Sequence, residues 1–425
     1  MSTFDRIEAG MPRLLSELAE PRMPDYLDIV ASRTADSRQR PAWTFPERWL
    51  PMSVVAVAPI GRHIPRWAFL VALLILALVA GVILVSTGRP SQPLPAPFGR
   101  ANAGLVIYDA GGDIMTVDPK TGSTATLVPG SPTDIAPRWS PDGSRFAFRR
   151  IVPGDQARVF VADADGSDIR PVSPEPMRGV TDHSFSPDGR HLLITSSGAT
   201  GHVITITDLV GGSTRVVEAP NGASLPSFRP PTGDSFVFVT GVRFSRGGQG
   251  LASYDMASGA IRTIVEPIPN AEIVGRPDYS PNGRQLAFAV WIPTTDTNSH
   301  IIVANADGSD QRRLPQPPGL CCEAAPTWSN DGTRLALTRW YDPTGEFVAV
   351  VPWDAGGVGK EFAVPGLFRA LIAWSPDDEW LLVTPQLDEY GIDRKSQILL
   401  NLASSETREV GWDTTSDPSI QRVAP

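Results

Sequence analysis

The sequence is short of the residues that build metal and catalytic sites. Of its 425 residues two are cysteines, the adjacent Cys321 and Cys322, and five are histidines at scattered positions. A zinc site uses four such ligands, spaced along the chain rather than side by side. Neither a Gly-x-Ser-x-Gly nucleophile turn nor a Gly-x-x-x-x-Gly-Lys-Ser/Thr phosphate loop occurs. We therefore expect no metal, no cofactor and no catalytic residue.

An excess of positive charge is also missing. The formal net charge is −9, and residues 67–425 carry 28 basic against 38 acidic side chains. A nucleic-acid partner requires a basic surface that neutralises phosphates. The charge balance therefore argues against nucleic acid and favours a soluble, acidic surface over this part of the chain.

One short phrase recurs six times between positions 139 and 378. It consists of an aromatic residue, then Ser or a substitute, then Pro-Asp-Gly or a near copy. The copies are Trp139-Ser140-Pro141-Asp142-Gly143, Phe185-Ser186-Pro187-Asp188-Gly189, Phe228-Arg229-Pro230 with Thr232-Gly233, Tyr279-Ser280-Pro281-Asn282-Gly283, Trp328-Ser329-Asn330-Asp331-Gly332 and Trp374-Ser375-Pro376-Asp377-Asp378. The aromatic residues are 46, 43, 51, 49 and 46 positions apart. A period of this length is typical of repeat architectures.

Each phrase is predicted to be a tight turn between two short strands. Proline presets φ, aspartate bonds to the local backbone and glycine tolerates positive φ. A strand-length apolar segment follows every phrase, for example residues 145–148 and 285–288. A second hairpin then follows, marked by Asp or Asn with a nearby Gly, as in residues 163–166. Four short strands per repeat form the blade of a β-propeller, and blades stack around an axis.

The number of blades follows from the second hairpins, which number seven. The extra hairpin, residues 118–122, precedes the first phrase, and strands are expected around it at 104–108, 114–117 and 124–128. That blade lacks its first strand. Residues 417–423 lie where the next first strand is due, since Ile420 follows Trp374 by 46 positions. We therefore predict an all-β fold of seven blades closed by the C-terminal strand, with six blades as the alternative.

The phrase together with the Ala-Asp-Gly-Ser-Asp turn of residues 164–168 resembles the TolB-like, WD40-like β-propeller repeat family. The resemblance covers residues 104–425 and implies a propeller domain over that range. Two copies depart from the pattern: the third widens to Pro-Pro-Thr-Gly, and the sixth has Asp378 where glycine is usual. These departures affect the expected turn geometry and leave the architecture unchanged.

An uncharged apolar run, residues 67–85, lies upstream of the repeats. A helix of this length spans about 28 Å, close to the hydrocarbon thickness of a bilayer. We predict a transmembrane helix at residues 67–86 and, because 66 residues precede it, not a cleaved signal peptide. Arg48, Arg62 and Arg66 precede the run, whereas Arg89 and Arg100 follow it. This bias predicts a cytoplasmic N-terminus.

This topology predicts a cell-membrane protein with four parts. Residues 1–66 form a cytoplasmic segment with short helices, residues 87–103 form a proline-rich stalk, and the propeller is extracytoplasmic. The layout resembles that of bacterial membrane-bound anti-sigma factors, which implies a cytoplasmic partner for residues 1–66. The zinc-binding His/Cys pattern of many such proteins is absent, since this segment has no cysteine and only His63.

The favoured function is binding, sensing or scaffolding at the cell envelope, with a protein or small ligand at the axial mouth of the propeller. The longest connections there are residues 243–250, 291–300, 316–325 and 387–395. A transcriptional regulator that signals through residues 1–66 is one alternative. A hydrolase or lyase on the propeller is another, and it requires a His/Asp/Glu cluster at one mouth.

Cys321 and Cys322 allow two interpretations. On an oxidising side of the membrane two thiols seldom remain free, so a vicinal disulfide is one. The other is a pair of small buried residues in the loop before Trp328.

Overall fold

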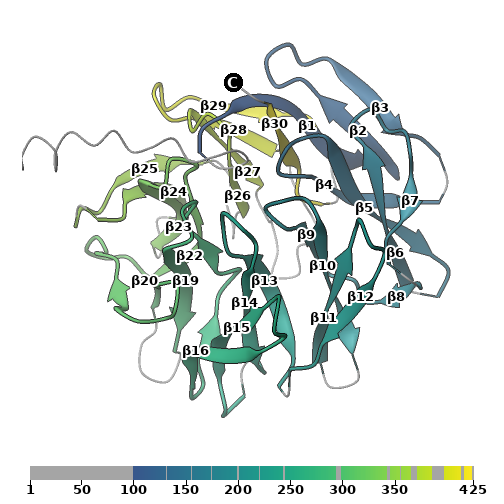
Figure 1. The fold of residues 1–425 in the computed structure, drawn as a ribbon. Helices are drawn as coiled ribbons and strands as arrows, with labels where there is room; N and C mark the ends of the chain where they lie inside the picture. The colour runs from purple at the N-terminus through teal and green to yellow at the C-terminus, as the bar shows by residue number, and fades with distance from the viewer. Residues whose placement is uncertain are drawn as a thin grey trace, which may run out of the picture. The chain divides into compact units, whose positions relative to one another are not determined.

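The computed structural model describes residues 99–423, except residues 131, 155, 174, 199–200, 220, 243–244, 293–297, 342–344, 355, 365–370, 385–396 and 413–415. The described residues form thirty strands in seven antiparallel sheets of four or five strands. The sheets are arranged around a common axis as the blades of a propeller (Figure 1). Seven sheets confirm the predicted seven-bladed all-β fold and exclude the alternative of six.

Each blade runs outward from the axis through four strand positions. The innermost strands are β30 (Ser419–Val423), β4 (Asp134–Trp139), β9 (Asp182–Phe185), β13 (Ala223–Phe228), β17 (Glu272–Ile273) with β18 (Asp278–Tyr279), β22 (Cys322–Trp328) and β26 (Leu371–Trp374), in blades 1 to 7. The second strands are β1 (Asn102–Ala110), β5 (Arg145–Val152), β10 (His191–Gly198), β14 (Ser235–Gly241), β19 (Gln285–Trp291), β23 (Arg334–Tyr341) and β27 (Trp380–Thr384).

The two outer positions follow the same blade order. The third strands are β2 (Asp113–Val117), β6 (Gln156–Asp163), β11 (Gly201–Asp208), β15 (Gln249–Asp255), β20 (Ser299–Asn305), β24 (Gly345–Pro352) and β28 (Gln397–Asn401). The outermost strands are β3 (Thr124–Val128), β7 (Arg170–Pro171), β12 (Thr214–Val217), β16 (Ile261–Ile268), β21 (Arg312–Arg313), β25 (Lys360–Ala363) and β29 (Thr407–Val410). The short β8 (Met177–Arg178) also pairs with β6.

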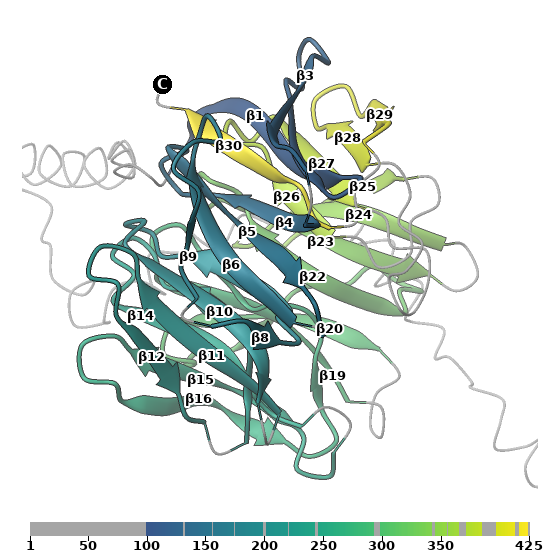
Figure 2. The same ribbon diagram turned by 90° about the vertical axis from the view of Figure 1, so that its right-hand side faces the viewer.

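The two ends of the ring meet in blade 1. Strand β30 pairs antiparallel with β1, with Val106 opposite Ile420 and Asn102 opposite Val423. The two strands run side by side in Figures 1 and 2. Strand β1 starts at Asn102, two residues before the predicted start of the propeller. The closure removes the unpaired edge that β1 would otherwise present.

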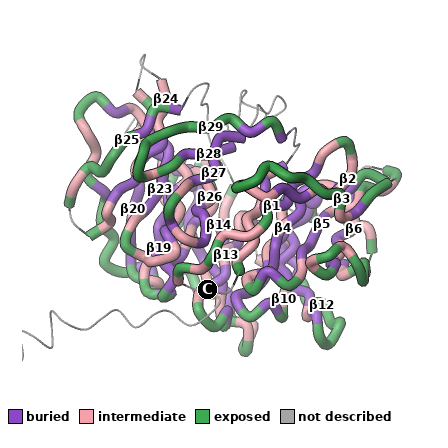
Figure 3. The backbone as a smooth tube through the Cα atoms, turned by 90° about the horizontal axis from the view of Figure 1, so that it is seen from above, coloured by how far each residue is buried: buried purple, intermediate pink, exposed green. Residues whose placement is uncertain are grey.

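The hydrophobic core is divided among the interfaces between blades. Seven clusters of buried apolar residues occur among the described residues, one between each pair of adjacent blades. At the junction of blades 7 and 1, Tyr108 stacks on Trp412 with ring centroids 5.8 Å apart. Figure 3 shows that the outer strands β3, β12 and β29 are mostly exposed. Each blade therefore depends on its neighbours to cover its faces.

The recurring phrase folds into one hydrogen-bonded turn. In blade 2 the Ser140 hydroxyl donates to Asp142 Oδ1 (2.6 Å) and accepts from the backbone N–H of Arg145 (3.0 Å). The N–H of Gly143 donates to the Ser140 carbonyl (2.9 Å), with φ of +70° at the glycine. The bond to the serine hydroxyl recurs in the phrases that begin at Phe185, Tyr279, Trp328 and Trp374. These serines are buried, so the phrase is part of the framework of the blade.

The third phrase makes a wider turn. The N–H of Gly233 donates to the carbonyl of Arg229, four residues earlier (3.0 Å), whereas Gly143 donates to a residue three earlier. The additional residue in Pro-Pro-Thr-Gly is accommodated without loss of the β13–β14 pairing.

Two other departures from the phrase, in adjacent blades, are joined by hydrogen bonds. Asn330 stands at the proline position of blade 6, and Asp378 stands at the glycine position of blade 7. Asp378 is 3% exposed and has φ of +61°. Its carboxylate accepts hydrogen bonds from Asn330 N (2.7 Å), Asn330 Nδ2 (2.8 Å) and Asp331 N (2.9 Å). Because proline has no N–H to donate, the asparagine and the aspartate depend on each other.

The predicted transmembrane helix, the cytoplasmic segment and residues 87–98 of the predicted stalk lie outside the described residues. Within the described part of the chain, no helix has the length and apolar character needed to cross a membrane.

We predict that Asp378→Gly destabilises the protein, although glycine adopts positive φ more easily. The change removes three hydrogen bonds to blade 6, and we expect a loss of about 1–3 kcal/mol in the free energy of unfolding. Asn330→Pro should destabilise as well. The double variant restores the usual phrase in both blades and should lose less than the sum of the single variants. Denaturant unfolding of the four proteins measures the coupling, and strictly additive losses would contradict it.

Candidate binding site in the axial cavity

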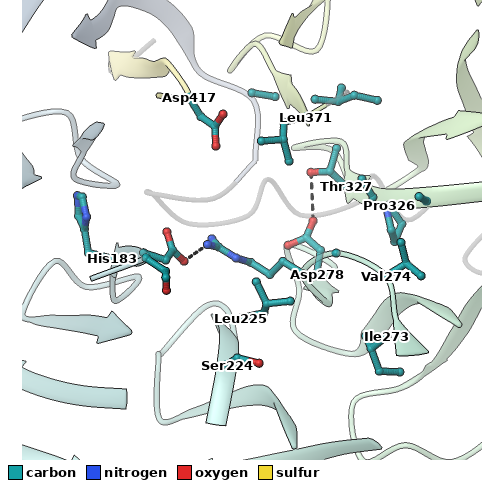
Figure 4. Close-up of a pocket in the computed structure, with 18 of the residues that line it drawn as sticks. His183, Ser224, Leu225, Ile273, Val274, Asp278, Pro326, Thr327, Leu371 and Asp417 are labelled. Carbon is teal, nitrogen blue, oxygen red and sulfur yellow. Dashed lines mark hydrogen bonds and ion pairs between the residues drawn. The ribbon is translucent and has the colours of Figure 1, made fainter. Parts of the chain in front are cut away.

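A cavity of about 1130 Å³ lies among the innermost strands. Every blade contributes to its wall, and Figure 4 shows several of the side chains that line it. Examples of the lining residues, one from each blade in the order of blades 1 to 7, are Asp417, Arg138, His183, Leu225, Asp278, Thr327 and Leu371.

The cavity lies toward one end of the blades. Its wall includes Gly201 and His202 at the start of the third strand of blade 3, and Asn221 and Gly222 in the connection that enters blade 4. Of the described residues that line it, only Trp328, Asn330 and Trp374 belong to turn phrases. The cavity therefore belongs to the mouth formed by the connections between blades, where the sequence predicts ligand binding.

An ion-paired group of side chains crosses the cavity. Arg276 of blade 5 forms an ion pair with Asp182 of blade 3. Arg138 Nη2 lies 3.6 Å from Asp182 Oδ1 and 3.8 Å from Asp417 Oδ2. Burial, reinforced by the charge of Arg138, lowers the pKa of Arg276 to about 10. Arg276 therefore remains charged at neutral pH, and with 32% of its side chain exposed it is accessible to a carboxylate.

The wall also includes apolar side chains. Leu225 of blade 4, Pro326 of blade 6 and Leu371 of blade 7 line the cavity and surround the charged side chains in Figure 4. Leu371 is 37% exposed although it is a large apolar side chain. The cavity thus offers both charged and apolar surface to a ligand, as binding pockets commonly do.

Asp278 is an acid of the cavity whose pKa is strongly perturbed. Burial raises its pKa to about 6, although its carboxylate accepts hydrogen bonds from the backbone N–H of Trp328 (2.8 Å) and the Thr327 hydroxyl (3.3 Å). The indole N–H of Trp328 donates to the Asp278 carbonyl (3.1 Å). Asp278 therefore joins blade 5 to blade 6 and also faces the cavity.

His183 is a neutral member of the wall at physiological pH. It is 2% exposed, and its Nε2 lies 3.3 Å from the carbonyl of Ala147. Burial, together with the positive charges of Arg149 and Arg138, lowers its pKa to about 3. His183 occupies a position that is proline in five other blades, two residues before the aromatic residue of the phrase or its counterpart Ile420.

Most of the residues that the sequence analysis singled out do not line this cavity. The phrase residues at 140–143, 186–189 and 280–283 do not line it, and Cys321 and Cys322 do not either. Of the predicted mouth connections, Gln249, Ala324 and Ala325 line the cavity. The described residues of 291–300 do not, and residues 387–395 lie outside the described chain.

The charged residues of the cavity occur at fixed positions within the sequence repeat, and this regularity could have identified them. Three of them lie three residues before the aromatic residue of the phrase or its counterpart Ile420. They are Asp182 before Phe185, Arg276 before Tyr279, and Asp417 before Ile420. Arg138 and Asp278 lie one residue before the aromatic residue. An alignment of the repeats on that residue brings these charges together in two columns.

Sequence comparison finds relatives that match part of the chain. The uncharacterized peptidase YuxL of Bacillus subtilis (strain 168) is 28% identical over 192 residues, which cover 44% of this chain and 26% of that protein. The uncharacterized protein Atu1656 of Agrobacterium fabrum is 28% identical over 191 residues, covering 41% and 61% respectively. The chain thus spans about a quarter of the first relative and less than two thirds of the second. No protein-family model matches the chain.

Solved structures with the same fold include proteins of different kinds. TolB from Acinetobacter baumannii has a TM-score of 0.50 at 16% identity over 74% of this chain and 81% of its own. An oligogalacturonate lyase in complex with manganese scores 0.52 at 16% identity, covering 74% and 85%. The propeller domain of the Trilobed protease from Pyrococcus furiosus scores 0.51 at 14% identity, covering 73% and 96%. The fold is therefore that of a TolB-like β-propeller.

We predict that Asp278→Asn stabilises the protein at neutral pH. The folded-state pKa of about 6 lies above the ordinary value of 3.8, so ionisation of Asp278 costs folding stability as the pH rises between these values. Asparagine cannot ionise and keeps an oxygen to accept the N–H of Trp328. At pH 7.5 the variant should unfold at a higher temperature than the wild type, with a free energy of unfolding larger by about 1 kcal/mol or more, and this gap should close near pH 4. Asp354→Asn, at an exposed site, is the control. A gap that does not change with pH would contradict the assignment.

Proposed function

We propose that this protein binds an extended peptide segment of a partner protein in its axial cavity, and that the propeller is a binding or scaffold domain. The observation that carries the proposal is a cavity of about 1130 Å³ whose wall combines paired charges with apolar side chains. An extended peptide presents charged groups, apolar side chains and a polar backbone within a narrow cross-section, and it fits both kinds of wall.

The charged part of the wall would select the ligand. The Arg276–Asp182 pair joins blades 5 and 3 across the cavity. An incoming carboxylate competes with Asp182 for the Arg276 guanidinium, and an incoming cation competes for Asp182. When a carboxylate takes Arg276, Asp182 keeps its contact with Arg138 (3.6 Å) and is not left uncompensated. We therefore expect ligands that carry a carboxylate at the depth of Arg276.

A second proposal is a hydrolase or lyase activity, favoured by Asp278. Its pKa of about 6 lies close to the range of a general acid or base, and the residue lines the cavity. One curated relative is named as a peptidase and one structural neighbour as a lyase. Cleavage of a bound ligand that Asp278→Asn abolishes would favour this activity over binding alone.

The proposed setting is the cell membrane, with the propeller outside the cytoplasm. The apolar run of residues 67–85 and its flanking arginines support this proposal. Deleting residues 67–86 should move the protein from the membrane pellet to the soluble fraction, whereas deleting residues 1–66 should leave it in the pellet. Retention of the first variant in the pellet would contradict the anchor.

Selection of peptides tests the binding proposal. A random heptapeptide display library is panned against the full-length protein, and the dissociation constants of the selected peptides are measured. We expect binding to weaken about tenfold or more in Arg276→Gln, because the cavity loses its carboxylate partner. Acidic peptides should bind more tightly to Asp182→Asn, in which the competing acid is removed.

The matched control for this selection is Arg190→Gln. Arg190 forms an exposed ion pair with Asp208 (3.2 Å) and does not line the cavity. Its substitution should leave peptide affinity unchanged. A selection that yields no binders, or binders that do not distinguish the Arg276 variant from the wild type, would overturn the proposal.

A further inference from the structure

Cys321 and Cys322 lie in the connection that enters blade 6. Cys322 is the first residue of β22, and Cys321 immediately precedes it. Their Sγ atoms are 3.1 Å apart, a contact distance that is about 1 Å longer than a disulfide bond. Both residues are partly exposed. Two thiols are thus held side by side where a soluble reagent reaches them.

The contact between the thiols requires an irregular backbone. Adjacent residues of a regular strand direct their side chains to opposite faces of the sheet. Cys322 lies opposite Trp340 in the β22–β23 register, and the N–H of Cys321 also donates to the Trp340 carbonyl (2.8 Å). Cys321 therefore lies just outside the regular alternation of β22, which begins at Cys322, and the two sulfur atoms come together there.

One of the two thiols is held firmly by its neighbours in the chain. Glu323, next to Cys322, is fully buried and forms an ion pair with Arg339 (2.9 Å). The N–H of Glu323 donates to Ser299 Oγ (3.0 Å), and that hydroxyl donates to the Glu323 carbonyl (2.6 Å). Ser299 belongs to blade 5. The position of Cys322 is therefore fixed by contacts with two blades.

The other thiol lies at the end of a loop that is open to solvent at Gly319. Gly319 has φ of +80°, and no atom lies within 4 Å of the place where a side chain would begin. Leu320 is buried, its N–H donates to the Pro317 carbonyl (3.4 Å), and its carbonyl accepts a hydrogen bond from Asn298 Nδ2 (3.3 Å). A movement of about 1 Å by the Cys321 sulfur toward that of Cys322 is enough to reach bonding distance.

We propose that Cys321 and Cys322 are a redox-active dithiol that forms a reversible vicinal disulfide by exchange with an external disulfide. One thiol, as the thiolate, attacks the external disulfide, releases one thiol from it and forms a mixed disulfide. The second thiolate then attacks the protein sulfur of that bond, forms the Cys321–Cys322 bond and releases the other external thiol. The dithiol is oxidised, the external disulfide is reduced to two thiols, and these thiols take up the two protons.

Trp340 reports the state of the pair. It is 40% exposed and lies directly opposite Cys322 in the β22–β23 register, so the two side chains are on the same face of the sheet. A disulfide quenches the fluorescence of a neighbouring indole by accepting an electron. The inference does not depend on the proposed peptide binding, since neither cysteine lines the axial cavity.

The test uses the full-length protein, first reduced and then equilibrated with oxidised glutathione. We expect the wild type to lose the mass of two hydrogen atoms, to lose reactivity toward a maleimide at both cysteines, and to lose tryptophan fluorescence. Reduced dithiothreitol should reverse all three changes. Cys321→Ser and Cys322→Ser should instead accumulate one glutathione adduct each, because the second thiol needed to release it is missing.

Further controls separate the outcomes. The fluorescence change should be absent in Trp340→Phe, whereas the mass change should persist there. Accumulation of a glutathione adduct on the wild type, a covalent dimer, or no mass change in the folded protein would each overturn the proposal. The decisive mass measurement is made on the wild type, so it does not require that any variant folds.

Discussion

The pairing of β30 with β1 holds the propeller closed, and the cavity depends on it. Ser416, Asp417 and Pro418, which lead into β30, form the blade 1 part of the cavity wall. Without this pairing, β1 would present an unpaired edge and Arg138 would lose the carboxylate of Asp417. A contact between residues about three hundred positions apart thus sets both the stability of the ring and the charge at its axis.

The innermost strands serve the framework and the cavity with the same residues. The Ser419 hydroxyl accepts the N–H of Trp139 in blade 2 (3.1 Å), and Asp278 accepts that of Trp328 in blade 6. The indole of Trp374 donates to the carbonyl of Thr327 (3.1 Å). The residue before the aromatic position therefore links its blade to the next one. A substitution there changes both the ligand surface and the blade interface, which is why the raised pKa of Asp278 affects stability as well as chemistry.

The repeats differ from one another where specific contacts replace the shared ones. Asp378 departs from the phrase at a buried site, and its partner Asn330 departs in the neighbouring blade, so the two changes compensate. Arg276 and Asp182 stand at equivalent repeat positions in two blades with opposite charge, and they pair across the cavity. Sequence divergence among the blades has thus produced an asymmetric axis from a nearly symmetric ring, and an asymmetric axis can hold a ligand in one orientation.

The sequence by itself determined the repeat period, the turn phrases, the seven blades and the closing strand at Ile420. These features depend on local hydrogen bonding, on strand alternation and on regular spacing, all of which are written in neighbouring residues. It did not reveal that Arg276 meets Asp182, 94 positions away, or that burial raises the pKa of Asp278. Only the tertiary structure decided these, because contacts across the axis and the loss of water around a side chain arise when the blades close into a ring.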